Sequence, residues 1–454
     1  MNNKKIVLIV ACLGSFLTPF MGSAINVALP EIGKEFEAGS VLLGWVATSY
    51  LLAAAVFLLP IGKLSDIWGR KRVFLIGLAL FSLFSFLCGL APSIPVLIGF
   101  RVFQAIGSAM IFGTAVAIVT SVFPVGERGA AMGITVASVY IGLSLGPFAG
   151  GFLTGLWGWR SIFFFTVPLG LGALILVFHY IKQEWADARG ESFDILGSIL
   201  YGVSLTLLMI GFSRLPGTSG IVLTALSLLM FAAFIKYEST VQFPVMNISI
   251  FKANRVFTFS NMAALIHYSA TFGVSFLLSF YLQYIKGLSP QHTGAILVAQ
   301  PVMMALFSPV MGKLSDKIQP RIVASFGMGM TALALFAFFF LGSATSIPFI
   351  IANLLFLGLG YAFFSSPNTN AVMSSVEKKF LGVASATLGT MRLVGQVFSM
   401  GIAMMLFALF LGGQKINASN HLPFIQSTRI AFLIFSILCA IGIFFSLARG
   451  KMNR

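Results

Sequence analysis

Two aspartates occupy the same short sequence in two distant parts of the chain. Residues 62–66 read Gly-Lys-Leu-Ser-Asp, and the same five residues recur at 312–316, 250 positions later. A carboxylate in such a turn can approach the free N–H groups at the start of a helix, where partial positive charge accumulates. The repeat indicates an internal duplication. We expect its two copies to form a gate made of Gly62, Asp66, Arg70, Gly312 and Asp316.

Each aspartate has an expected partner in the other half of the chain. Asp66 would meet the helix that begins near Leu381 and Gly382, and Asp316 the helix that begins near Gly129. Each contact would form only when the side of the protein that carries the repeated motif is closed. The alternative is that each aspartate pairs with a neighbouring Arg or Lys at a solvated turn. We favour the gate because the duplication carries the aspartate with it.

Three titratable side chains lie deep in apolar runs and are candidates for proton coupling. Arg101 and Arg392 are the deepest cations, and an unpaired charge in the bilayer core costs about 3 kcal/mol. Their partners would be backbone carbonyls, Gln104, Gln396 or an anionic substrate, although Arg101 could instead reach the outer surface. His267 has an ordinary pKa of about 6.5, which suits proton transfer, but a lone histidine in a membrane span is more often a hydrogen-bonded packing residue.

The carboxylates fall elsewhere. All 12 Asp and Glu residues lie at the ends of apolar runs or in the loops between them. A carboxylate in mid-membrane is the usual proton carrier, because burial raises its pKa into the working range. The sequence therefore leaves proton coupling open.

Polar side chains within apolar runs should point to protein or water rather than to lipid. Phe20, Phe272 and Phe276 could add apolar surface, although for any one of the 48 phenylalanines contact with lipid is the alternative. The mixture suits a neutral, cationic or amphipathic organic molecule. His267 and Asn368 are further polar residues within spans that could line a cavity. The candidates for substrate binding are Asn26, Tyr50, Gln104, Tyr140, Tyr281, Gln300, Asn353, Asn370 and Gln396.

Composition sets the fold class. Apolar residues make up 58% of the chain and charged residues 9%, whereas a soluble domain carries about 25% charged residues. The chain is predicted to be an all-α polytopic membrane protein. Fourteen spans are expected, at residues 5–29, 41–61, 73–91, 95–121, 130–155, 161–182, 194–213, 219–237, 257–285, 292–313, 321–342, 347–373, 380–411 and 427–448.

Loop charge predicts the orientation. With alternating sides, 20 Lys and Arg fall on the side of the N-terminus and six on the other, while Arg101 and Arg392 lie within spans. This excess places both termini in the cytoplasm of a multi-pass plasma-membrane protein. It also explains the net charge of +16 without nucleic acid as a partner.

The repeat spacing predicts the domain layout. We expect two six-helix bundles related by pseudo-two-fold symmetry, at residues 1–185 and 253–454, joined by a linker and two extra helices at 186–252. The extra pair is expected to be a spacer that faces lipid. In the fifth span, Gly142, Gly146 and Gly150 recur on one helix face beside Pro147, and we expect them to pack closely against another helix.

Several motifs resemble those of the major facilitator superfamily, and specifically its fourteen-span drug:proton antiporter branch. Residues 62–72 resemble its loop motif between spans 2 and 3. Residues 101–107 resemble its Arg-x-x-Gln-Gly motif, with alanine where glycine is usual. Residues 142–151 resemble the motif in span 5 that marks exporters, and residues 26–30 and 157–163 resemble further segments of the branch. The resemblance covers nearly the whole chain.

The resemblance implies a secondary active transporter that exports a drug-like or amphipathic solute by alternating access, plausibly coupled to protons. One departure bears on coupling: Met21 stands where relatives usually carry Asp. The alternatives are a facilitator or metabolite exporter without conventional proton coupling, and a non-transporting membrane sensor. We find no catalytic constellation, and Cys12, Cys88 and Cys439 lie in apolar runs. We expect no enzyme activity, no cofactor and no metal. We expect a monomer in the lipid bilayer that binds a small-molecule substrate and, if transport is proton-coupled, protons.

Overall fold

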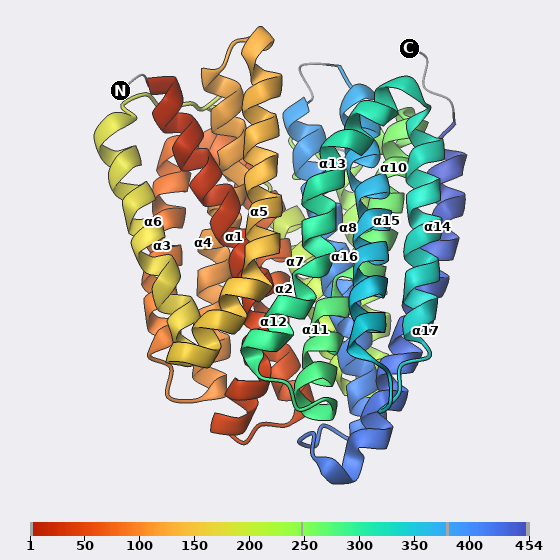
Figure 1. Ribbon diagram of the computed structural model, residues 1–454. Helices are drawn as coiled ribbons and strands as arrows, with labels where there is room; N and C mark the ends of the chain where they lie inside the picture. The colour runs from red at the N-terminus through yellow and green to blue at the C-terminus, as the bar shows by residue number, and fades with distance from the viewer. Residues whose placement is uncertain (1–2, 247, 378–380, 451–454) are drawn as a thin grey trace.

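The helices account for nearly all of the described chain. The computed structural model describes residues 3–246, 248–377 and 381–450. Within these ranges, 14 helices are long and apolar enough to cross a membrane (Figure 1). Backbone polar groups in lipid must bond within their own segment, so each long apolar run forms a helix. The predicted fourteen-span, all-α architecture is confirmed.

The first six spans pack together, and we call them the first half. Helix α1 lies along α5, α3 packs against α4 and α6, and α2 packs against α4. The bounds of these helices are α1 (Asn3–Glu35), α2 (Ser40–Trp68), α3 (Arg70–Gly89), α4 (Ile94–Val122), α5 (Val125–Trp157) and α6 (Arg160–Tyr180).

The last six spans form the second half. Helix α14 packs against α15 and α17, α13 against α15, and α10 against α16 and α17. Their elements, with the short helices α9 and η3, are α9 (Ile248–Ala253), α10 (Arg255–Thr271), α11 (Gly273–Phe280), η1 (Tyr281–Ile285), α12 (Pro290–Leu297), α13 (Ala299–Lys317), α14 (Pro320–Phe338), α15 (Ile347–Ser374), α16 (Leu381–Leu411), η3 (Ala418–Asn420) and α17 (His421–Ala448).

Two spans of the second half are interrupted. In the tenth span, α12 ends at Leu297 and α13 begins at Ala299. Pro301 has no N–H to give to the carbonyl of Leu297, so the regular hydrogen-bond ladder breaks there. The ninth span widens into a π-helical turn at its end, where the N–H of Lys286 donates to the carbonyl of Tyr281 at 3.2 Å. Such irregular turns in membrane helices are tolerated where protein covers them.

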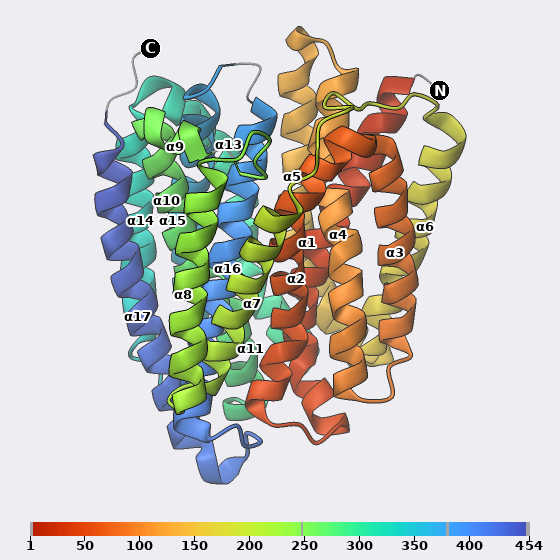
Figure 2. The same ribbon diagram turned by 180° about the vertical axis from the view of Figure 1, so that it is seen from behind.

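The two extra helices, α7 (Ile195–Arg214) and α8 (Thr218–Glu238), lie in front of both halves in Figure 2. Helix α7 contacts α2 in the first half and α16 in the second. The hydroxyl of Tyr201 donates to the carbonyl of Ala55 on α2 at 3.1 Å. Helix α8 packs on α7 and exposes apolar side chains such as Leu228 and Leu229. Helix α7 therefore contacts both halves, whereas α8 forms an outer layer on α7, and its contact with lipid stays a prediction.

The start of α1 and the end of α17 lie at the same end of the molecule (Figures 1 and 2). We call this end the terminus face and the other end the opposite face. The arrangement follows from the even number of spans. Loop charge predicts that the terminus face is cytoplasmic.

The small face of α5 lies against α1. A Cβ on Gly142 would lie 2.6 Å from the carbonyl oxygen of Phe16, and a Cβ on Gly150 would lie 2.8 Å from that of Ala24. Gly146 meets Ser23 in the same groove. Backbone contact at this distance requires glycine. Pro147 turns its carbonyl to the other side, against Gly294 of α12 in the second half.

Candidate functional site

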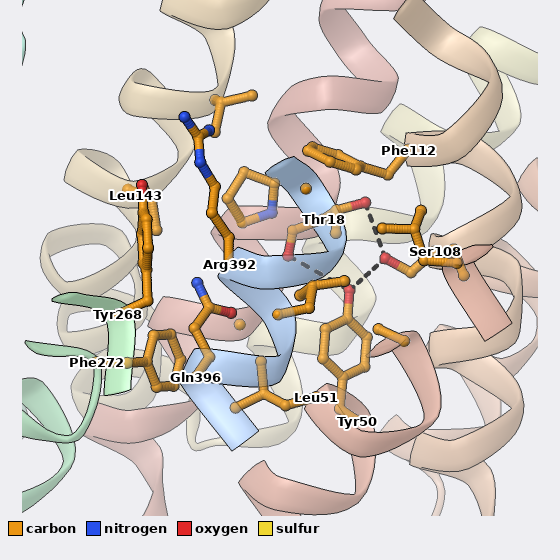
Figure 3. Close-up of a pocket in the computed structure, with 18 of the residues that line it drawn as sticks. Thr18, Tyr50, Leu51, Ser108, Phe112, Leu143, Tyr268, Phe272, Arg392 and Gln396 are labelled. Atoms are coloured by element: carbon orange, nitrogen blue, oxygen red, sulfur yellow. Dashed lines mark hydrogen bonds between the residues drawn. The ribbon is translucent and has the colours of Figure 1, made fainter. Parts of the chain in front are cut away.

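A cavity lies between the two halves, near the middle of the spans (Figure 3). Its volume is about 90 Å³ as traced by the centre of a water-sized sphere, which is room for several waters. Helices α1, α2, α4 and α5 line one side, and α10, α15 and α16 line the other. The lining residues are Thr18, Pro19, Gly22, Tyr50, Leu51, Ala54, Leu58, Ser108, Ala109, Phe112, Val139, Tyr140, Leu143, Tyr268, Phe272, Tyr361, Gly389, Arg392, Leu393 and Gln396.

The wall from the first half carries a chain of hydroxyl groups. The hydroxyls of Tyr50 and Ser108 lie 2.7 Å apart, and Ser108 donates to the hydroxyl of Thr18 at 2.8 Å. Figure 3 shows this chain on one side of the cavity, facing Tyr268, Phe272, Arg392 and Gln396 on the other. Both walls therefore offer polar atoms among aromatic rings, which is the usual make-up of an organic ligand site.

Behind Tyr50 lies Arg101, which is fully buried. Its guanidinium carbon lies 4.1 Å from the centre of the Tyr50 ring. Its Nε donates to the carbonyl of Val46 at 3.2 Å and its Nη1 to Gln104 Oε1 at 2.7 Å. Gln104 in turn donates to Ser85 at 2.7 Å. The expected carbonyl and Gln104 partners of Arg101 are present, and its place in the interior rules out contact with the outer surface.

Towards the terminus face, described contacts between the two halves border the cavity. The hydroxyls of Tyr140 on α5 and Ser365 on α15 lie 2.9 Å apart. A Cβ on Gly389 of α16 would be in ordinary van der Waals contact with Leu58 and Phe112, 3.7 Å from each. Among the described residues, the halves are therefore joined on this side by the Tyr140–Ser365 hydrogen bond and by apolar contacts.

Towards the opposite face, hydrogen bonds and an ion pair join the two halves. Ser279 donates to the carbonyl of Asn26 at 2.7 Å, and Gln283 donates to that of Val27 at 3.0 Å. At the surface, the Nζ of Lys415 donates to the Glu37 carboxylate at 2.8 Å. The structure is therefore closed on the opposite face.

His267 lies outside the cavity, behind two of its tyrosines. Its ring stacks on Phe364 with 4.0 Å between centroids and meets Tyr361 edge-on at 4.8 Å. It is fully buried, and its two ring nitrogens have no hydrogen-bond partner among the described residues. A proton bound there would have to pass Tyr268 or Tyr361 to reach the cavity.

Of the nine predicted substrate-binding residues, Tyr50, Tyr140 and Gln396 line the cavity, together with the coupling candidate Arg392. The other six lie elsewhere, and most bond to neighbouring helices. These six are Asn26 beneath Ser279, Gln104 beside Arg101, Tyr281 on the carbonyl of Gly342, Gln300 beside Gly358, Asn353 on the carbonyl of Ala334, and Asn370 on the hydroxyl of Ser315.

The first copy of the repeated motif forms contacts with the first half and with the linker that follows it. Arg70 Nε donates to Asp66 Oδ1 at 2.8 Å, and Arg70 Nη1 donates to Ser121 at 2.7 Å. Arg70 Nη2 also pairs with Asp187 at 2.8 Å. The aspartate thus pairs with a neighbouring arginine in this conformation, as the alternative to the gate supposed. The side chains of Asp316, Leu381 and Gly382, and the placement around Gly129, lie outside what the structure describes.

Sequence reasoning missed the linker that covers this motif. Both carboxylate oxygens of Glu184 accept backbone N–H groups at the start of α3, from Lys71 at 2.8 Å and Arg72 at 3.2 Å. Gly69, which precedes α3 with a φ of 116°, leaves the space that Glu184 fills. Glu191 pairs with Lys63. The sequence contained a signal for this contact, because the motif at 62–72 is rich in basic residues and the linker at 182–194 contains several acidic ones.

The two glycines of the repeat differ in their surroundings. A Cβ on Gly62 would meet nothing within 4 Å, whereas one on Gly312 would lie 2.8 Å from the hydroxyl of Ser366. Only the second copy therefore needs glycine for a close approach in this conformation.

Comparison with known families decides the classification. The model of the Major Facilitator Superfamily matches residues 11–260 and again residues 260–452. The chain belongs to the major facilitator superfamily. It is therefore a membrane transporter rather than an enzyme. Its fourteen spans fit the fourteen-span branch of the superfamily.

Relatives of this superfamily member include exporters and a vitamin transporter. The riboflavin transporter RibZ of Clostridioides difficile is 32% identical over 98% of this chain and 97% of its own length. The multidrug resistance protein Stp of Mycobacterium tuberculosis is 31% identical over 88% of this chain and 76% of its own. The tetracenomycin C resistance and export protein of Streptomyces glaucescens is 29% identical over 83% and 71%.

Solved structures of the superfamily share the fold. A bacterial homologue of the human lysosomal transporter Spinster, solved in an inward-facing conformation, aligns with a TM-score of 0.73. It is 17% identical, and the alignment covers 99% of this chain and 97% of the other. A D-xylose–proton symporter aligns with a TM-score of 0.67 and 14% identity. These likenesses concern the fold alone.

Proposed function

We propose that the protein is a secondary transporter that exports an organic solute across the plasma membrane by alternating access. The observation that carries this proposal is the cavity at the meeting of the two halves, with contacts between the halves on both sides of it. Such a site is served from either side when the halves rock about it. In this proposal both termini are cytoplasmic, so the conformation described is closed to the outside.

The proposal assigns a role to each part of the chain. Residues 1–185 and 253–454 form the two moving bundles, and residues 186–252 form the linker and the extra helix pair. Tyr50, Tyr140, Gln396 and Arg392 contact the solute, while Asp66 and Asp316 hold the cytoplasmic side shut when the cavity opens outwards. The protein works as a monomer.

One observation favours a second candidate, a transporter without conventional proton coupling. Met21 is fully buried, and none of the described residues that line the cavity is Asp or Glu. Proton-driven exporters usually protonate a carboxylate within the membrane. If protons drive this transporter, they must use Arg101, Arg392 or His267, or a carboxylate outside the cavity.

Flux into proteoliposomes separates the two candidates. The purified protein is reconstituted, and uptake of riboflavin, a lipophilic cation, a neutral drug and an aromatic anion is followed with and without an imposed pH gradient. Riboflavin is included because a riboflavin transporter is among the relatives. Proton-coupled export predicts that the gradient drives accumulation above equilibrium. Equilibration that ignores the gradient would favour the uncoupled transporter, and binding without flux of any compound would reject the proposal.

A further inference from the structure

The cavity wall formed by the second half carries a cation that lacks an anionic partner. The Nη2 of Arg392 donates to the hydroxyl of Thr369 at 2.7 Å. The guanidinium carbon lies 5.5 Å from the centre of the Tyr268 ring. The Nε of Arg392 is buried and has no hydrogen-bond partner among the described residues. A guanidinium stays charged under all physiological conditions, so burying it beside an unused donor is unfavourable until an acceptor arrives.

The rest of the cavity does not supply that acceptor. The described residues that line it include hydroxyls, phenols and one amide, but no carboxylate. The phenol of Tyr50 already bonds to Ser108, and that of Tyr140 bonds to Ser365. The second deep cation, Arg101, lies directly behind Tyr50 and is held by neutral groups. Both cations near the cavity therefore contribute positive potential that no described lining residue cancels.

Aromatic rings also line the side of the cavity that carries Arg392. Tyr268 and Tyr361 meet edge-on, 5.6 Å between centroids, and Figure 3 shows Phe272 and Tyr268 beside Gln396 and Arg392. Aromatic rings in this arrangement bind flat, conjugated molecules by stacking and edge contacts. The charged and the aromatic parts of a ligand would thus be held by neighbouring residues.

We propose that the solute carried by this cavity is an aromatic anion, whose acidic oxygen accepts a hydrogen bond from the Nε of Arg392. Its ring system then lies against Tyr268 and Phe272. A carboxylate, a phosphate or an ionised phenol all offer the acceptor that the guanidinium edge matches. A lipophilic cation would instead meet repulsion from Arg392 and Arg101. This assignment rests on the proposed function, since it names the substrate class of the same site.

Two dyes of matched shape and opposite charge test the assignment. Fluorescein is an anion at pH 7.5 and rhodamine 123 is a cation, and both share a three-ring core. Their binding to the purified protein, in nanodiscs of uncharged phosphatidylcholine, is measured by fluorescence anisotropy. We expect fluorescein to bind at least about tenfold more tightly than rhodamine 123. The proposal is overturned if rhodamine 123 binds as tightly as fluorescein, or if fluorescein does not bind.

Variants then locate the contact. Arg392→Gln should weaken fluorescein binding by about tenfold or more and leave rhodamine 123 binding unchanged or improved. Arg392→Lys keeps the charge but removes the Nε donor, and should fall between the two. The control is Arg189→Gln, at an exposed position of the terminus face. It also removes one positive charge and should bind fluorescein as tightly as the parent protein does. Fluorescein binding to Arg392→Gln at the parent affinity would refute the assignment.

Binding and flux separate the two proposals. If fluorescein binds through Arg392 but does not cross the membrane in proteoliposomes, the proposed transport fails while the anion site stands. If other solutes cross and neither dye distinguishes Arg392→Gln from the parent, the anion site fails while transport stands. Thermal melting of each variant, compared with the parent, identifies any loss of binding that comes from unfolding.

Discussion

The phenol oxygen of Tyr140 on α5 and the hydroxyl oxygen of Ser365 on α15 lie 2.9 Å apart, and they join the two halves on the terminus side of the cavity. Tyr140 also lines the cavity. A solute that enters must pass or displace this pair, so one hydrogen bond connects occupancy of the cavity to the contact between the halves.

Removing the Tyr140–Ser365 bond should ease opening towards the terminus face. A single hydrogen bond of this kind contributes about 0.5–1.5 kcal/mol, so Tyr140→Phe and Ser365→Ala should each change the flux of a transported solute by about twofold to tenfold. The double variant should match Tyr140→Phe, because Ser365→Ala removes no interaction that Tyr140→Phe has not already removed. Additive effects in proteoliposome flux would show that the two hydroxyls act separately.

Glycines on one helix should respond very differently to the same substitution. Gly150→Ala places a methyl group against the backbone of α1, 2.8 Å from the carbonyl oxygen of Ala24. Overpacking of this kind costs about 1–3 kcal/mol, so the variant should melt at a lower temperature and lose flux. Gly133→Ala, also on α5, meets nothing within 4 Å and serves as the control. Equal melting temperatures for both variants would contradict close packing of α1 on α5.

Asp66→Asn should separate a gate from a local ion pair. The proposed contact with the start of α16 is worth about 1 kcal/mol, so its loss should reduce flux about fivefold without reducing expression. Asp187→Asn also removes a partner of Arg70 but does not belong to the repeat, and its flux should match that of the parent. If the two variants lose flux equally, Asp66 serves only to hold Arg70.

The seal on the opposite face should be sensitive to acid. The hydrogen bond from Lys415 and its positive charge hold the pKa of Glu37 below its ordinary value. A lowered pKa means that the ionised carboxylate favours this closed conformation above the ordinary pKa of about 4.3. The contribution is lost as pH falls through the lowered pKa. It is small, because both side chains are exposed and water screens their attraction.

Spin labels can report this seal. Labels at the exposed positions Leu42 on α2 and Leu422 on α17 should keep one distance distribution from neutral pH down to about pH 5 and broaden below it. Glu37→Gln should show at neutral pH the same slight broadening that the parent shows only in acid, and should change little on acidification. A parent protein whose distances ignore pH would argue against the role of this pair.

The fourteen helices were predictable because lipid leaves a long apolar segment no alternative to helical hydrogen bonding. The positions of interruptions were less predictable. Pro301 breaks the tenth span near its middle, whereas Pro147 and Pro309 lie inside continuous helices. Proline removes a donor in each case, and the neighbouring helices decide whether the chain continues through it.

The cavity residues were predicted only in part, for a physical reason. A polar side chain within a span needs a partner, but the partner can be a neighbouring helix as well as a cavity. Asn353 satisfies its amide on the carbonyl of Ala334, while Gln396 lines the cavity. Thr18 and Ser108 were missed because small hydroxyls often bond within their own helix. Their contacts with Tyr50 depend on the angles at which α1, α2 and α4 pack.

The linker after α6 has a mechanical consequence. Glu184, Asp187 and Glu191 fasten this segment to the first half, and Tyr201 ties α7 to α2. On the other flank of α7, Met209 and Phe212 meet Gly401 of α16 through apolar contacts. When the bundles rock, the inserted pair should travel with the first half, and the seam between α7 and α16 should be the slip plane. A bulky side chain in place of Gly401 would block sliding between α7 and α16 without contacting the cavity or the gate at Asp66 and Asp316.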